Sequence, residues 1–183
     1  MGGLMAIKKG ACHMAGAHLL DPEDGSYNIS YIKKYLPNQK VWIINLVMRD
    51  QGLIVAKTNP KNIQSIQDLK DKGLKFINRQ PGSGTRILFD YKLKSLGLSI
   101  HDIQGYENDE YTHMSVAVSV LSGRVDAGLG IHAAARALDL DFIPIVTEEY
   151  DLIIPDRFYK TPKIQTLLKI IQTEKFKDRI QSP

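Results

Sequence analysis

Asn78-Arg79-Gln80-Pro81-Gly82-Ser83-Gly84-Thr85-Arg86 is a glycine-rich turn between a short apolar strand, Phe76-Ile77, and a segment with helical spacing, Ile87 to Leu96. The apolar residues of that segment recur at i, i+4 and i+7, which places them on one buried face: Phe89, Leu93 and Leu96. Gly97 stands where a left-handed helix cap is favoured. A strand, turn and helix in this order direct free backbone N–H groups at whatever lies in front of the helix.

The residues of this turn suit an anion. Gly82 and Gly84 remove side chains that would block close approach, and Ser83 and Thr85 add hydroxyl groups. Arg86 adds a forked cation that fits an oxyanion. The turn is not a Walker A loop, because no Gly-Lys-Ser/Thr follows, and it lacks the third glycine of a dinucleotide fingerprint. The pattern predicts an anion-binding turn, and a Ser or Thr helix cap without a ligand is the alternative.

The bulk composition is that of a globular protein. The chain has 183 residues, 43% of them hydrophobic and 24% charged, so it can form one medium domain or two small lobes. The single cysteine, Cys12, cannot form an internal disulfide, which fits a reducing compartment. No secretory leader and no apolar run of about 20 residues occurs, so we expect a cytoplasmic protein without a membrane partner.

The formal net charge is +4, with basic residues spread along the chain. Nucleic-acid binding calls for clustered Lys and Arg with interleaved aromatic residues. That pattern is missing, so we expect no direct nucleic-acid binding. The spread charge favours a small anionic ligand slightly.

Strand-like and helix-like segments alternate along the whole chain, which predicts an α/β fold with mixed, largely parallel sheets. The predicted strands are residues 11–20, 41–47, 52–56, 76–77, 124–130, 142–146 and 150–154. The predicted helices are residues 3–9, 27–36, 65–72, 87–96, 112–121, 131–138, 163–171 and 174–180.

Two further segments carry candidate ligand-binding residues. Thr112 and His113 open a helix whose first N–H groups would form a second anion site if they face the first turn. His18 follows a strand of small residues, and Tyr27 and Asn28 follow the next turn. Small residues at a strand end leave room for a ligand in open α/β sheets. The alternatives are a Thr cap with an exposed histidine, and a histidine bonded within its own lobe.

Catalytic and metal-binding patterns are weak. The chain has neither a Gly-x-Ser-x-Gly elbow nor an HExxH motif, so we assign no catalytic residue and expect no enzyme activity. Cys12 and His13 are adjacent, but a metal site needs three or four ligands. Asp126 is interpreted as a structural residue rather than a base. We therefore expect no metal and no covalently bound cofactor.

Three separated motifs, in this order, resemble one family. They are Ala15-Gly16-Ala17-His18-Leu19-Leu20-Asp21-Pro22-Glu23 with Gly25 and Tyr27-Asn28, then the 78–86 turn, then Thr112-His113 with Val116-Ala117, Gly123 and Asp126-Ala127-Gly128-Leu129-Gly130. The family is the periplasmic-binding-protein-like domain of molybdopterin biosynthesis proteins and molybdate-responsive regulators. The resemblance extends from about residue 2 to residue 180.

The resemblance implies a two-lobed type II periplasmic-binding-protein-like fold with a two-strand hinge and a ligand in the cleft between the lobes. Lobe I would take residues 1–73, lobe II residues 74–146, and residues 147–183 would return to lobe I. The ligand would be molybdate, tungstate or a molybdopterin-type molecule, bound without catalysis by cleft closure. The implied ligand-binding residues are Ser83, Gly84, Thr85, Arg86, Thr112, His113, His18, Tyr27 and Asn28.

Members of this family are often fused to a molybdopterin-synthesis enzyme or to a DNA-binding module. The resemblance therefore leaves open an effector-sensing domain of a transcription regulator, or a component of molybdenum insertion. The family's domain usually begins with a further strand and helix, whereas this sequence starts within that helix. We accordingly expect lobe I to lack its first strand, with weakened binding or self-association. His13 stands where many relatives carry Asp.

Overall fold

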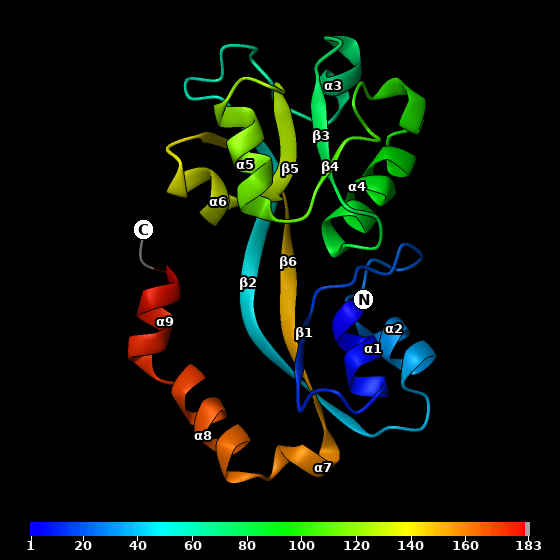
Figure 1. Cartoon of the computed structure of the whole chain (residues 1–183), viewed down its shortest axis with the longest axis vertical. Coiled ribbons are helices and arrows are strands. Elements are labelled where there is room, and N and C mark those ends of the chain that lie inside the picture. Colours follow the sequence, from blue (N-terminus) through cyan, green and yellow to red (C-terminus); the bar gives the residue numbers. More distant parts are fainter. Residues whose placement is uncertain (182–183) are drawn as a thin grey trace. The chain divides into compact units, whose positions relative to one another are not determined.

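The computed structural model describes residues 1–181, which form two compact units (Figure 1). Unit 1 comprises residues 1–48 and the described residues from 149 onward, and unit 2 comprises Arg49–Glu148. Within residues 1–181, no helix is both long and apolar enough to cross a membrane.

The strands β2 (Val41–Val55) and β6 (Asp141–Pro155) continue from one unit into the other. The other elements of unit 1 are α1 (Gly2–Lys8), β1 (Ala15–Ala17), α2 (Ile29–Tyr35), α7 (Asp156–Tyr159), α8 (Pro162–Ile171) and α9 (Glu174–Gln181). Those of unit 2 are α3 (Gln67–Asp71), β3 (Phe76–Arg79), α4 (Gly84–Ser95), the 3-10 turn η1 (Ile100–Asp102), β4 (Asp109–Glu110), α5 (His113–Leu121), β5 (Ala127–Ile131) and α6 (His132–Ala137).

Each of β2 and β6 is one continuous strand of 15 residues. The sequence interpretation divided each into two strands, and this division is wrong because the polar residues in the middle extend the strand instead of turning. Their side chains bond one another across the two strands: Asp50 with Thr147, and Arg49 and Gln51 with Glu148. The two compact units divide the chain after residue 48 and after residue 148.

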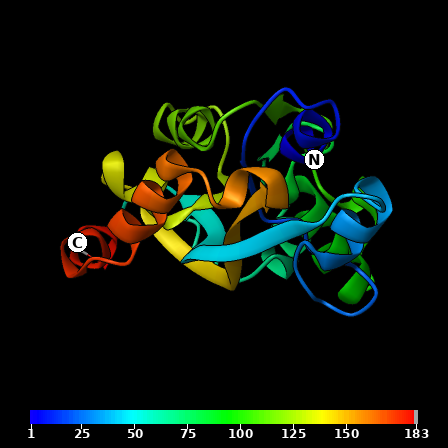
Figure 2. The same ribbon diagram turned by 90° about the horizontal axis from the view of Figure 1, so that it is seen from below.

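In unit 1 the helix α8 packs on β6. The helices α7, α8 and α9 follow the end of β6 one after another (Figure 1, Figure 2). Ile164 and Leu168, four residues apart on α8, are buried against Leu152 and Ile154 of β6. β1 pairs antiparallel with β6 over Ala15–Ala17. It is shorter than the strand predicted for residues 11–20.

Unit 2 contains the parallel part of the sheet. β5, β3 and β4 are parallel neighbours, and β2 pairs antiparallel with β5. The strand order of the sheet is β1-β6-β2-β5-β3-β4, so the predicted α/β class with mixed pairing is confirmed. The small residues of β5 allow α5 to approach closely, since a Cβ atom on Gly128 would lie 2.5 Å from Val116 Cγ1.

The helix α4 begins three residues earlier than the apolar spacing predicted, at Gly84. Phe89 and Leu93 are buried as expected, and the Phe89 ring stacks on Phe76 with centroids 4.5 Å apart. Leu96 is 49% exposed, because it is the helix C-cap and lies beyond the buried face. Gly97 adopts φ +68°, which confirms the predicted left-handed cap.

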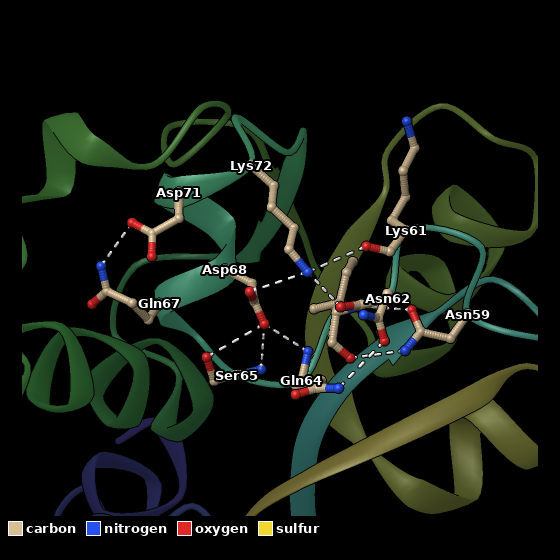
Figure 3. Close-up of polar contacts among 10 residues, drawn as sticks. Asn59, Lys61, Asn62, Gln64, Ser65, Gln67, Asp68, Asp71 and Lys72 are labelled. Carbon is tan, nitrogen blue, oxygen red and sulfur yellow. Dashed lines mark hydrogen bonds and ion pairs between the residues drawn. The ribbon is translucent and has the colours of Figure 1, made fainter.

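The segment between β2 and α3 is held by polar contacts (Figure 3). The Asp68 carboxylate accepts hydrogen bonds from the backbone N–H groups of Gln64 and Ser65, at 2.7 and 3.0 Å. The Lys72 ammonium lies 3.2 Å from the same carboxylate. Asp68 therefore satisfies two backbone donors in the segment directly before α3.

Candidate functional site

In unit 2, three helices start at the carboxyl ends of three parallel strands. β3 leads into α4, β4 into α5 and β5 into α6. Arg79 pairs with Glu110 at the ends of β3 and β4, so the turns that precede α4 and α5 leave the sheet at the same edge. In open α/β sheets this edge is where ligands bind.

The turn before α4 has the predicted cap chemistry. Gly82 adopts φ +79°, and the Ser83 hydroxyl accepts the backbone N–H of Arg86 at 3.2 Å. The Ser83 hydroxyl is thus a helix cap, as the alternative interpretation expected for this residue type. The N–H groups of Gly84 and Thr85 donate to no acceptor within residues 1–181, so they remain available at the helix start.

Thr85 carries a buried hydroxyl at the start of α4. The residue is 1% exposed, and its hydroxyl oxygen has no hydrogen-bond partner among the described residues. Burying a hydroxyl without a partner costs about 1–3 kcal/mol. Buried polar groups are nearly always paired, so the hydroxyl in the first turn of α4 has hydrogen-bonding capacity that the described residues do not use.

The Arg86 side chain contacts groups on both sides of the turn. Its guanidinium carbon lies 3.9 Å from the centroid of the Tyr106 ring, and Nη1 donates to the carbonyl of Arg79 at 3.2 Å. Nε lies 3.5 Å from a carboxylate oxygen of Asp90, which also accepts the Tyr106 hydroxyl at 2.6 Å. Burial raises the pKa of Tyr106, so this phenol stays a donor. Arg86 therefore ties the end of β3 to α4.

Arg79, the last residue of β3, was not singled out by the sequence interpretation as a site residue. It is 8% exposed. Its Nε donates to the carbonyl of Glu110 at 3.1 Å, and its Nη2 donates to the carbonyl of Tyr111 at 2.9 Å. Burial, and then the positive charge of Arg49, lower the pKa of Arg79. Its position directly after Asn78 in the glycine-rich turn was the available signal.

At the start of α5, Thr112 acts as the N-cap. Its hydroxyl accepts the backbone N–H of Ser115 at 2.9 Å, and it lines an open hollow of about 540 Å³ along the helix. His113 is half-buried and packs against β5. Its Nδ1 lies 3.6 Å from the position that a Cβ atom on Gly130 would take. The N-terminus of α5 therefore shares the sheet edge with that of α4.

The remaining predicted site residues belong to unit 1. The His18 ring stacks on Tyr150 with centroids 5.4 Å apart, and Tyr27 forms a β-bridge with Leu20. Asn28 is fully buried at φ +66° and occupies the N-cap position of α2 without capping it. Its amide is bonded within unit 1 to Leu19 N, Ala17 O and Asp151 Oδ2.

Comparison with known proteins places the chain in a family. The PBP superfamily domain matches residues 1–172. The Bacillus subtilis (strain 168) protein YvgK is 37% identical over 177 residues, which is 97% of this chain and 57% of YvgK. This chain thus spans less than two thirds of the length of that relative.

Solved structures show the same fold at low sequence identity. A phosphate ABC transporter substrate-binding protein with bound phosphate from Clostridium perfringens has a TM-score of 0.69 and 14% identity, covering 97% of this chain and 79% of its own. The tungstate ABC transporter structure from Geobacter sulfurreducens has a TM-score of 0.65 and 15% identity, covering 94% and 78%. With the match over residues 1–172, the chain belongs to the PBP superfamily of periplasmic-binding-protein-like domains.

Proposed function

We propose that this chain binds a small oxyanion of the molybdate or tungstate type, or a molybdopterin-type ligand, without catalysing a reaction. The observation that carries the proposal is the buried, unpartnered Thr85 hydroxyl beside the open N–H groups of Gly84 and Thr85. Three donors at one helix start match the oxygens of a tetrahedral anion, and the helix dipole adds to their attraction. The relatives that are named for phosphate and tungstate support this choice of ligand class.

The ligand-binding set that we propose comprises Ser83, Gly84, Thr85, Arg86, Thr112 and His113 in unit 2, and His18, Tyr27 and Asn28 in unit 1. Ser83, Arg86 and Asn28 would act by shaping the site, because their side chains are bonded to other protein groups. Thr85 would contact the anion directly.

A phosphorylated pterin presents the same charge to the start of α4 as a free oxyanion does. If the chain acts in molybdenum cofactor biosynthesis, we expect a molybdopterin-synthesis enzyme as a fused domain or partner. If it senses an effector for transcription, we expect a DNA-binding module instead. Both roles are predictions that depend on the same binding site. A cytoplasmic location is a separate prediction.

Isothermal titration calorimetry with molybdate, tungstate, sulfate and phosphate tests the proposal. We expect roughly micromolar binding of molybdate or tungstate, and a loss of about tenfold or more in Thr85→Val. Valine keeps the shape of threonine, so the variant should fold normally and even gain slight stability. Thr173→Val, which alters an exposed hydroxyl of unit 1, is the matched control and should bind as the parent does.

Two results would contradict parts of the proposal. The first is no heat with any of the four anions, which would contradict binding of a free oxyanion and leave only the molybdopterin-type ligand. The second is unchanged affinity in Thr85→Val, which would show that the buried hydroxyl does not meet the anion.

A further inference from the structure

We propose that Arg79, and not Arg86, supplies the positive charge that meets a dianionic tetrahedral ligand at the starts of α4 and α5. This inference rests on the oxyanion-binding function proposed above and assigns its charge-bearing residue.

Arg79 is a buried cation without a carboxylate partner among the described residues. It is 8% exposed, and within residues 1–181 no carboxylate lies in ion-pair distance of its guanidinium. Two carboxylates of the sheet are engaged elsewhere. Glu110, on the neighbouring strand β4, pairs with Arg124, and Glu148, on β6, pairs with Arg49. A buried charge is normally paired, because the cost of removing it from water is several kcal/mol. A bound anion would provide the missing partner.

Arg79 also lies among other positive groups. Its Nη2 donates to Tyr111 O, directly before the N-cap of α5, so the cation lies beside a helix N-terminus. A helix N-terminus carries partial positive charge and disfavours a neighbouring cation. The charge of Arg49 adds to this repulsion. An arrangement of like charges becomes favourable when an anion occupies the site, and a dianion gains more than a monoanion.

The two arginines differ in their remaining hydrogen-bonding capacity. Arg79 Nη1 donates to no acceptor among the described residues. Arg86, in contrast, is stacked on Tyr106, bonded to Arg79 O and adjacent to Asp90, so its charge is already compensated. Arg86 is therefore a positioning residue, which holds the backbone of the residue that carries the charge.

The test compares tungstate with perrhenate, a tetrahedral oxyanion of similar size and half the charge, by calorimetry on the full chain at low salt. We expect the parent to bind tungstate at least about tenfold more tightly than perrhenate. Arg79→Gln should lower tungstate affinity by about 30-fold and bring the preference close to one, whereas Arg79→Lys should keep most of the preference. Arg86→Gln should keep the preference while melting at a lower temperature. Arg179→Gln, on the exposed face of α9, removes one charge as a control and should match the parent.

The outcomes separate the two proposals. If the parent binds neither anion, the oxyanion function fails and this inference fails with it. If the parent prefers tungstate and Arg79→Gln retains that preference, or Arg86→Gln loses it, the inference alone is overturned. If Arg79→Gln does not fold, Arg79→Met serves as the second neutral variant and is judged by the same criterion. If Arg79 had only a structural role, Arg79→Gln would lower the affinities for tungstate and perrhenate equally and leave the ratio of the two affinities unchanged.

Discussion

Asn28 is expected to matter for the stability of unit 1 more than for ligand contact. Its amide makes buried hydrogen bonds of 2.8 Å with Leu19 N, 3.3 Å with Ala17 O and 2.8 Å with Asp151 Oδ2. Asn28→Ala removes all three and leaves the Leu19 N–H and part of the Asp151 carboxylate without partners. Each unsatisfied buried group costs about 1–3 kcal/mol, and alanine at φ +66° adds about 1 kcal/mol, so we expect a loss of about 4 kcal/mol in the free energy of unfolding.

Urea denaturation followed by fluorescence measures this loss directly. Trp42 is the single tryptophan and belongs to unit 1, where its ring stacks on Tyr159 at 4.1 Å, so the signal reports on the unit that the change affects. Asn28→Gly removes the same hydrogen bonds without the backbone strain, and should therefore be about 1 kcal/mol more stable than Asn28→Ala. The reasoning is refuted if Asn28→Ala loses less than about 1 kcal/mol while anion binding disappears.

Two further changes test the packing of unit 2. Asp68→Asn should cost about 1 kcal/mol at neutral pH, because the carboxylate accepts two backbone N–H groups directly before α3. The backbone hydrogen bond from Gln64, first among several causes, lowers the pKa of Asp68. Its stabilisation is therefore complete above the unfolded pKa near 4 and is lost as pH falls through the lower folded value, so urea midpoints of parent and variant should converge in acid. Gly52→Ala places a Cβ atom 2.1 Å from the carbonyl oxygen of Ile143, and a thermal melt should show a midpoint about 5–10 °C lower. An unchanged melting temperature would show that the backbone shifts freely there.

The strand, turn and helix around residues 76–97 could be predicted because local signals agree there. Gly82 and Gly97 take the positive φ values that their residue type favours, and Ser83 caps α4 as a serine in that position does. The prediction that Leu96 is buried is wrong, because the spacing of apolar residues does not show where the buried face ends. Its exposure follows from the helix ending at Ser95.

The continuity of β2 and β6 could not be predicted from the residues alone. A polar segment such as Arg49-Asp50-Gln51 is typical of a turn when it follows an apolar run. What makes it strand is a set of partners about 97 residues later in the chain, where Glu148 and Thr147 bond its side chains. Contacts this distant in sequence override local preference, because burying Gln51 and Glu148 is tolerable only when each is paired.

The two arginines of the glycine-rich turn show the same limit for the site. Residue type suits both to an oxyanion, and the sequence favoured Arg86 because it follows the hydroxyl residues. Their roles differ because Arg79 ends a strand and reaches across to the neighbouring strand, whereas Arg86 lies in the first turn of a helix, where its side chain packs back on Tyr106. A compensated arginine adds little net charge, and an uncompensated one dominates the local field. The candidate for ligand charge is therefore decided by which carboxylates and rings surround each guanidinium. For Arg86 the carboxylate is Asp90 of α4, and the ring is Tyr106 in the segment before β4.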